Sequence, residues 1–317
     1  MKFLLTAINA KFIHSNPAIY SLRAGVGEKL QPYVELAEFT INESLESILE
    51  GIWKRQPKVI GFSCYIWNWK LIREILTELP KILPDTEIWL GGPEVTYDGP
   101  GLLREFPQVT GIMVGEGEVT FREVLGQYVR EAESTGQSEQ QPEPDSIEQQ
   151  AADRTGTVAG KNVAERFGQI SGLCLASGYT APRELTDLTT LPFLYEDMEP
   201  FTNRIIYYET SRGCPYRCSY CLSSIDKKVR LRDIDVVKRE LQFFLDQNVK
   251  QVKFIDRTFN CDHKHAMEIW RYIYEHDNGV TNFHFEISAD ILREEEIALL
   301  NRFRPGLAQL EIGVQST

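Results

Sequence analysis

The stretch SRGCPYRCSYCLSS places three cysteines within eight positions, at Cys214, Cys218 and Cys221. Their spacing is C-x3-C-x2-C, and thiolates bunched in this way indicate zinc or an iron–sulfur cluster more often than disulfide bonds in a reducing compartment. Zinc completes a tetrahedron and needs a fourth ligand, for which Cys261 and His263 are candidates. A four-iron cluster on three thiolates instead leaves one iron open for a substrate or cofactor.

The composition is that of a globular protein, with 317 residues of which 42% are hydrophobic and 25% are charged. This length is enough for about two domains. No run approaches the roughly 18 apolar residues of a membrane span, and the first residues lack the features of a signal peptide. We therefore expect a cytoplasmic protein without a membrane partner. The net charge of −12 argues against an extended basic surface for nucleic acid.

Short apolar runs alternate with helical periodicity along residues 1–130. Repeated β-α units of this kind predict an α/β domain with a doubly wound parallel sheet, in the flavodoxin-like strand order. Such a sheet binds its ligands at the carboxyl ends of the strands. The predicted strands are Lys2–Ile8, Val34–Thr40, Lys58–Cys64, Glu87–Leu90 and Gly111–Val114.

The loops expected after four of these strands are rich in glycine and polar residues. They read NAKFIHSNPA, SCYIWNW, GGPEVTYDGPG and GEGEVTF. Glycine lets a backbone approach a ligand closely, and hydroxyl groups donate hydrogen bonds, although turn chemistry accounts for any one such loop taken alone. Four of them at one predicted edge favour a ligand site.

Residues 131–165 differ in composition, because they contain almost no aromatic residues and are rich in Gln, Glu and Ser. Such a stretch cannot bury enough apolar surface to offset the entropy lost on ordering. We predict a flexible insert over 131–165. It is followed by a connector over 166–203, which includes a short β-ribbon in ISGLCLASGYT.

Strand and helix patterns alternate again over residues 204–317, the second predicted domain. RIIYYETS, KQVKFIDRTF, NFHFEISAD and LAQLEIGVQS are predicted strands with helices between them. This alternation predicts a partial β/α barrel, whose chemistry lies at the carboxyl ends of the strands. The cysteine loop follows the first strand at that edge. Because the sequence ends in a strand pattern without a closing helix, we expect it to be truncated at the C-terminus.

The cysteine loop, with the aromatic Tyr220 before its last cysteine, resembles that of the radical S-adenosylmethionine (SAM) enzymes. The resemblance covers residues 204–317. It implies that Cys214, Cys218 and Cys221 are the metal ligands and the catalytic residues, holding a [4Fe–4S] cluster whose open iron binds SAM. Reduction of the cluster would cleave SAM to methionine and a 5′-deoxyadenosyl radical that abstracts hydrogen, which is chemistry of the cofactors.

The same resemblance assigns SAM contacts to side chains near the strand ends. The segment FIDRTF stands where the family contacts the SAM amino group, although it departs from the Gly-Gly-Glu form common in the superfamily. A structural ion pair or hydrogen bond at the mouth of the barrel is the alternative for the acidic residues. The implied cofactor contacts are Tyr220, Asp256, Thr258, Glu286, Glu311 and Gln315.

Residues 1–129 resemble the cobalamin (B12)-binding domain that precedes many radical SAM modules. The Asp-x-His-x-x-Gly sequence, by which some cobalamin enzymes supply a histidine to cobalt, is absent, and NAKFIHSN holds only His14. Cobalamin would therefore bind without that lower ligand, with Trp67 and Trp69 either shielding the ring or packing in the core. A domain that has lost cobalamin remains open. The implied cobalamin contacts are Ser63, Tyr65, Gly91, Gly92, Gly115 and Glu116.

Together these resemblances predict a radical SAM enzyme that uses cobalamin for radical methylation or rearrangement, including ring formation, of an unidentified small-molecule substrate. A flavodoxin or ferredoxin would supply the electron. A tRNA-modifying methylthiotransferase and a non-enzymatic, zinc-stabilised binding module remain as alternatives. The stretches INAKFIHSN, SCYIWNW and VKFIDRTFNC are similar to those of bacterial proteins without assigned substrates.

Overall fold

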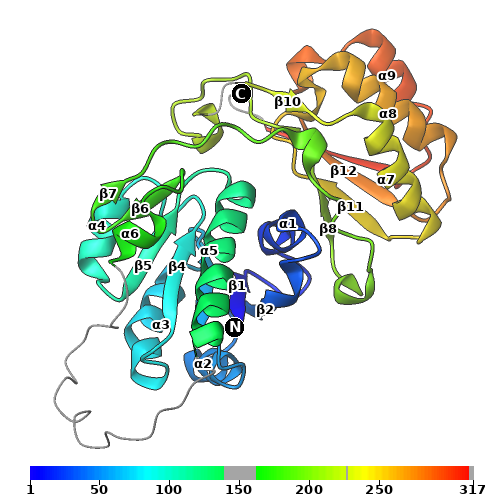
Figure 1. The fold of residues 1–317 in the computed structure, drawn as a ribbon. Coiled ribbons are helices and arrows are strands. Elements are labelled where there is room, and N and C mark those ends of the chain that lie inside the picture. The colour runs from blue at the N-terminus through cyan, green and yellow to red at the C-terminus, as the bar shows by residue number, and fades with distance from the viewer. Residues whose placement is uncertain (139–161, 226–227, 314–317) are drawn as a thin grey trace, which may run out of the picture. The chain divides into compact units, whose positions relative to one another are not determined.

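The computed structural model describes residues 1–138, 162–225 and 228–313. The chain divides into two compact units. The first comprises Met1–Phe12 and Asn16–Thr186, and the second comprises Ile13–Ser15 and Asp187–Thr317. Figure 1 draws both units, and each is described here by itself.

The first unit is built on a seven-stranded sheet in the order β2-β1-β3-β4-β5-β6-β7. The first five strands pair in parallel, and β6 and β7 extend the sheet as an antiparallel hairpin. The order β2-β1-β3-β4-β5 confirms the flavodoxin-like prediction. The strands are β1 (Phe3–Asn9), β2 (Val34–Thr40), β3 (Val59–Ser63), β4 (Glu87–Gly91), β5 (Val109–Met113), β6 (Leu173–Leu175) and β7 (Gly178–Tyr179).

Helices cover both faces of this sheet (Figure 1). On one face pack α2 (Leu45–Trp53), α3 (Trp69–Ile82) and α4 (Gly99–Glu105). On the other pack α1 (Pro17–Gly25), α5 (Gly117–Ser138) and α6 (Val163–Phe167). All seven residues of the interior strand β1 are buried, as is expected for a parallel strand covered on both sides.

The structure differs from the predicted insert and connector at their ends. Helix α5 continues to Ser138, inside the predicted insert, because Glu, Gln and Ala are good helix formers even where apolar residues are few. The part of the insert at 139–161 lies outside the described residues. The predicted β-ribbon is present as β6 and β7, but it joins the sheet of the first unit, and the boundary between units falls after Thr186. The remaining domain limits stay predictions.

The second unit contains a four-stranded parallel sheet in the order β13-β12-β11-β8. Consecutive strands of this sheet lie side by side with an α-helix between each pair, which is the winding of a partial β/α barrel. The strands are β8 (Ile206–Tyr208), β11 (Gln251–Phe254), β12 (Asn282–Ile287) and β13 (Ala308–Ile312), and the helices are α7 (Ile234–Asp246), α8 (His263–Glu275) and α9 (Glu294–Leu300).

The two faces of this sheet have different chemistry. Phe254, Phe283 and Phe285 are buried together with Phe244 of α7 and Trp270 of α8. Because side chains alternate along a strand, the neighbouring residues Tyr207, Lys253, His284, Glu286 and Glu311 are placed on the opposite face. The edge strand β8 also receives a short parallel bridge from His14 to Ile205.

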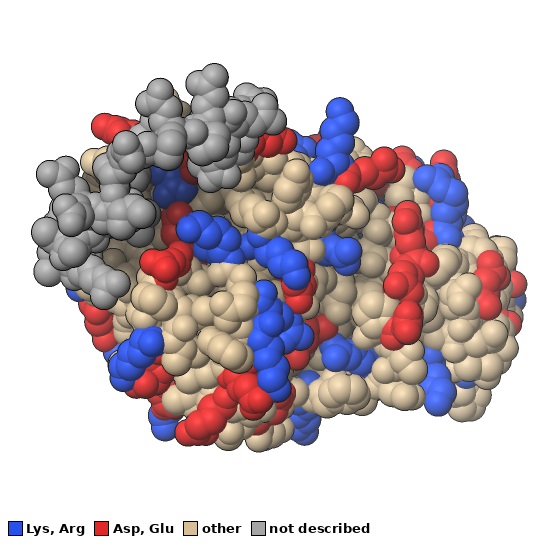
Figure 2. All heavy atoms as spheres, turned by 60° about the horizontal axis from the view of Figure 1, so that its bottom comes forward, with Lys and Arg blue, Asp and Glu red and all other residues tan. Residues whose placement is uncertain are grey.

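No helix in the described part of the chain has the length and apolar character needed to cross a membrane. On the face drawn in Figure 2, lysine and arginine side chains lie among aspartate and glutamate side chains.

Candidate functional site

The cysteine loop starts at the carboxyl end of β8 and is closed at its base by a short antiparallel ladder. Strand β9 (Ser211–Arg212) pairs with β10 (Arg230–Leu231), with Arg212 opposite Arg230 and Ser211 opposite Leu231. Gly213, directly after β9, has a φ of 100°, a left-handed conformation that favours glycine. The loop is therefore a hairpin at the edge where a β/α barrel holds its chemistry.

The three cysteines of this loop have different exposures. Cys214 is buried, Cys221 is half-buried, Cys218 is exposed, and all three are free thiols. The backbone N–H of Cys221 donates to the carbonyl of Cys218 at 3.1 Å, forming a tight turn between them. Within residues 1–138, 162–225 and 228–313, no three His, Cys, Asp or Glu side chains are gathered closely enough to hold a metal ion. The three thiols therefore do not converge in this structure.

The chemistry of the donor set nevertheless fits an iron–sulfur cluster. Three thiols follow one strand within eight residues, and none is used in a disulfide. Soft sulfur donors in this arrangement suit iron or zinc and exclude hard ions such as Mg²⁺. A tetrahedral zinc site would need one more protein ligand. His263, one candidate for it, is bound through Nδ1 to the Glu296 carboxylate at 2.8 Å.

Asp256 and Thr258 follow β11 and reach the start of the cysteine loop. The Cys214 thiol lies 3.6 Å from the Thr258 hydroxyl. The Asp256 carboxylate accepts hydrogen bonds from the backbone N–H of Thr210 at 3.1 Å, from the Thr210 hydroxyl at 2.7 Å and from the Ser211 side chain. Burial raises the pKa of Asp256 to about 6, although these hydrogen bonds oppose the shift.

Glu286 and Glu311 are brought together on the polar face of the second sheet, where they share a cation. The Lys253 ammonium lies 3.0 Å from Glu311 and 3.6 Å from Glu286. His284 Nε2 lies 3.0 Å from the same Glu311 oxygen. The hydrogen bond from Lys253 lowers the pKa of Glu311, and burial lowers the pKa of His284. These contacts match the structural ion pair that the sequence left as an alternative, and the SAM contacts stay predictions.

The two other implied SAM contacts, Tyr220 and Gln315, are not brought together with these residues among those that the structure describes. Tyr220 lies at the exposed tip of the cysteine loop. Gln315 lies outside the described residues. Sequence reasoning missed Lys253 and Thr210, although both stand in the strand segments it had marked. Their signal was a polar residue in a strand pattern, which does not say what the side chain contacts.

In the first unit, Asn68 anchors the loop that follows β3. This fully buried side chain donates to the carbonyl of Ile8 at 3.0 Å and to that of Ser63 at 2.9 Å, and it accepts from the N–H of Tyr65 at 2.8 Å. The Ser63 hydroxyl in turn accepts from the Asn16 amide at 3.2 Å. Sequence reasoning missed Asn68, which ties the ends of two adjacent strands to one loop.

The three glycines predicted to contact cobalamin have different surroundings. Gly92 has a φ of 115°, and a Cβ there would clash with the carbonyl oxygen of Cys64. This glycine is therefore required by the packing of two loops. Gly115 has a φ of 80° and nothing within 4 Å of a built Cβ, while a Cβ on Gly91 would make ordinary contact with Met113. Gly91 and Gly115 thus leave room that Gly92 does not.

Aromatic side chains stand near the same edge. Tyr65 and Trp67 stack with ring centroids 4.4 Å apart and planes 8° from parallel, and Trp67 is 47% exposed. Trp69 instead packs edge-on against Phe106. The two tryptophans therefore differ. Trp67 lies at the surface, where shielding of a bound ring stays a prediction, and Trp69 packs among the helices. The Glu116 carboxylate accepts the N–H of Thr186 at 2.7 Å, which fixes the end of the first unit.

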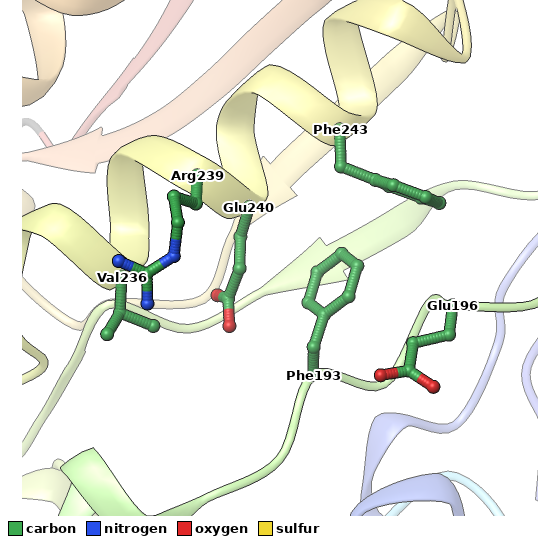
Figure 3. Close-up of a pocket in the computed structure, with 6 residues that line it drawn as sticks. All are labelled: Phe193, Glu196, Val236, Arg239, Glu240 and Phe243. Carbon is green, nitrogen blue, oxygen red and sulfur yellow. The ribbon is translucent and has the colours of Figure 1, made fainter.

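A cavity of about 420 Å³ lies beside α7, and none of the predicted site residues lines it. Figure 3 shows its lining, with the rings of Phe193 and Phe243 near one another and the Glu240 carboxylate beside them. Glu240 is already bound by Arg232 and by the Tyr208 hydroxyl. This cavity therefore does not belong to the candidate site.

Comparison with known proteins divides the chain as the two units do. Residues 4–125 match the family model described as the B12 binding domain, and residues 208–317 match that of the radical SAM superfamily. The 2-(S-pantetheinyl)-carbapenam-3-carboxylate methyltransferase of Streptantibioticus cattleyicolor is 28% identical over 68% of this chain and 29% of its own length. The anaerobic magnesium-protoporphyrin IX monomethyl ester cyclase of Rubrivivax gelatinosus is 23% identical over 86% of this chain and 46% of its own.

Among solved structures, the cobalamin-dependent SAM radical enzyme OxsB, with aqua-cobalamin and SAM bound, matches with a TM-score of 0.70. The match covers 99% of this chain and 44% of that one, at 17% identity, and so it supports the fold. The chain spans less than half the length of these three relatives.

Proposed function

Because this chain belongs to the radical SAM superfamily, in the subclass whose radical SAM domain follows a B12-binding domain, we propose that it is a cobalamin-dependent radical SAM enzyme acting on a small molecule. One observation carries the proposal. The B12-binding match covers the five parallel strands of the first unit and ends within α5, and the radical SAM match starts at Tyr208, shortly before the three-cysteine loop. The two cofactor domains therefore occur in one chain in that order.

Cys214, Cys218 and Cys221 would hold the [4Fe–4S] cluster. When bound, the reduced cluster supplies the electron that cleaves SAM, and cobalamin supplies a methyl group. A protein of this kind binds and orients these groups and keeps water from them. Thr258, whose hydroxyl lies 3.6 Å from the Cys214 thiol, is placed to donate a hydrogen bond to a ligating sulfur.

The polar face of the second sheet is our candidate for holding SAM or substrate. Lys253, Glu286 and Glu311 combine one positive and two negative charges there, so an amino group or a carboxylate of a bound molecule finds a partner of opposite sign. The relevant side chains come from adjacent strands β11, β12 and β13, which fixes their spacing. In the first unit, glycine and aromatic residues at the sheet edge are our candidates for holding cobalamin.

Gly91, Gly115 and Tyr65 are the contacts we propose for cobalamin, because the two glycines leave space at the sheet edge and the half-buried Tyr65 ring stacks there on the exposed Trp67 ring. Ser63, Gly92 and Glu116 are also retained from the resemblance, although each has a packing or hydrogen-bonding task of its own. His14 forms a hydrogen bond through Nδ1 with the Tyr207 hydroxyl. Binding of cobalamin without a histidine ligand to cobalt is proposed because the Asp-x-His-x-x-Gly sequence is absent.

The reaction we propose first is methyl transfer to an unactivated carbon, and the second is ring formation. The matched relatives are named for these two outcomes, a carbapenam methyltransferase and a protoporphyrin ester cyclase. A flavodoxin or ferredoxin is proposed as electron donor, since reductive cleavage consumes one electron. A tRNA methylthiotransferase is less favoured because the net charge is −12, and because lysine and arginine lie among aspartate and glutamate on the face drawn in Figure 2.

Reconstitution under anoxic conditions tests this function. The chain with iron, sulfide, SAM and a strong reductant should become brown and release methionine and 5′-deoxyadenosine, which mass spectrometry detects. With added hydroxocobalamin it should retain a corrinoid spectrum through gel filtration. A colourless protein with bound zinc would support the binding-module alternative, and a brown protein that retains no corrinoid would point to a domain that has lost cobalamin.

A further inference from the structure

Asp256 ties the base of the cysteine loop to the neighbouring strand β11. It stands two residues after Phe254, the last residue of that strand, and its side chain is 1% exposed. Its two carboxylate oxygens accept from Thr210, one from the backbone N–H at 3.1 Å and the other from the hydroxyl at 2.7 Å. A third hydrogen bond comes from the side chain of Ser211.

Thr210 is held from its other side as well. Its carbonyl accepts the backbone N–H of Arg232 at 2.8 Å, which extends the ladder between β9 and β10. Thr210 itself is fully buried. The three polar groups of this residue, its N–H, its hydroxyl and its carbonyl, are thus all bound just four residues before Cys214.

These contacts distinguish between the two roles predicted for Asp256, a contact with the amino group of SAM and a structural hydrogen bond. A carboxylate that contacts the amino group of SAM needs an oxygen facing the open edge of the sheet. Here both oxygens are directed at Thr210, and almost none of the side chain reaches solvent. A buried acceptor bound by several donors in fixed geometry instead holds the backbone that donates to it.

We propose that Asp256 is a positioning residue, which fixes Thr210 and Ser211 so that Cys214 is presented beside Thr258 for cluster binding. This inference rests on the proposed function only in its last step, the cluster. The fixing of the loop base is a property of the metal-free chain. No covalent or redox step at Asp256 is involved.

The test uses Thr210, because this buried residue has no access to SAM. Thr210→Val keeps the shape and removes the hydroxyl donor, whereas Thr210→Ser keeps that donor. In the metal-free chain, hydrogen–deuterium exchange at Thr210 and the amides up to Cys214 should be about tenfold faster in Thr210→Val, the effect of losing one buried hydrogen bond. Exchange in Thr210→Ser should stay near wild type.

Iron retention after anoxic reconstitution is the second readout. Thr210→Val and Asp256→Asn should lose most of their iron, and Thr210→Ser should keep it. The control for general destabilisation is Glu296→Gln, another fully buried carboxylate of the same unit, which binds His263 and the N–H of Arg293 near α9. Glu296→Gln should lower the melting temperature and still retain iron.

Wild-type exchange and full iron content in Thr210→Val would overturn the inference. So would a variant Asp256→Asn that keeps its iron and loses only affinity for SAM, because the carboxylate would then act on the cofactor. Failure of the wild-type chain itself to take up iron and sulfide would overturn the proposed function together with this inference. Faster exchange in the metal-free Thr210→Val variant together with wild-type iron content would contradict the claim that the fixed loop base is needed for cluster binding.

Discussion

The Cys214 thiol and the Thr258 hydroxyl lie 3.6 Å apart, and both side chains are buried. The contact joins the first cysteine of the loop after β8 to the chain that leaves β11. A loop cysteine fixed in this way has its sulfur next to a hydrogen-bond donor, which is one of the means by which a protein adjusts the potential of an iron–sulfur cluster.

Replacing Thr258 with valine should therefore lower the reduction potential of the bound cluster by a few tens of millivolts. The reduced cluster carries more negative charge, and removal of a donor to its sulfur destabilises that state more than the oxidised one. Redox titration followed by electron paramagnetic resonance measures the change. Thr258→Ser keeps the hydroxyl and should keep the potential; an equal shift in both variants would contradict the role of the hydroxyl.

In the first unit, Gly92→Ala should destabilise the fold by about 3 kcal/mol, because both a left-handed backbone and a clash with the Cys64 carbonyl oppose a Cβ. Gly115→Ala is the matched variant, since its φ is also positive and the surrounding space is open. It should cost only about 1 kcal/mol. Chemical denaturation followed by fluorescence gives both values, and similar costs at the two sites would show that the clash is relieved.

Arg232 and Glu240 form a two-pronged ion pair with both N–O distances at 2.7 Å, and both residues are buried. Glu240→Gln leaves the guanidinium without a counter-charge and should cost about 3 to 5 kcal/mol of unfolding free energy. Glu268→Gln breaks the partly exposed pair with Lys238 and should cost less than about 1 kcal/mol. Equal losses in urea denaturation would contradict the difference in burial.

His265 of α8 should make stability depend on pH. Burial lowers the pKa of its imidazole below the usual 6.5, an effect that the Asp262 carboxylate partly opposes. The unfolded chain then binds the proton more readily than the folded chain. The free energy of unfolding is therefore highest above pH 6.5, and it decreases as the pH falls toward the lower pKa of the folded state.

His265→Phe should flatten that part of the stability profile, since it removes the titrating ring. It also removes Nε2, a buried nitrogen without a hydrogen-bond partner among the described residues. The measurement is the melting temperature of both proteins between pH 5 and pH 8. Parallel profiles for wild type and variant would mean that the lowered pKa belongs to another group.

Much of the fold could be predicted from the sequence, because strand and helix periods are local. The order of the five parallel strands followed from repeated β-α units, and the cysteine loop was placed correctly at a strand end. The end of α5 was not predicted, since polar composition alone does not distinguish a solvated helix from an unfolded chain. The two possibilities are indistinguishable until the packing is known.

The site was harder to predict, for a physical reason. Beyond the end of a strand the alternation of faces stops, so the sequence placed Asp256 at the correct edge but gave no direction for its side chain. The structure turns it toward Thr210. Asn68 joins the ends of β1 and β3, which lie far apart in sequence and meet only when the sheet forms. Such long-range partners carry no local signal.

The most direct test of the account is the iron and acid-labile sulfide content of the chain reconstituted without oxygen. Wild type and Cys261→Ser should each hold about four irons and four sulfides, the content of one cubane cluster. Cys214→Ser, Cys218→Ser and Cys221→Ser should each lose them. Stoichiometric zinc without sulfide in the wild-type chain, or a cluster that survives all three substitutions in the loop, would contradict the central claim.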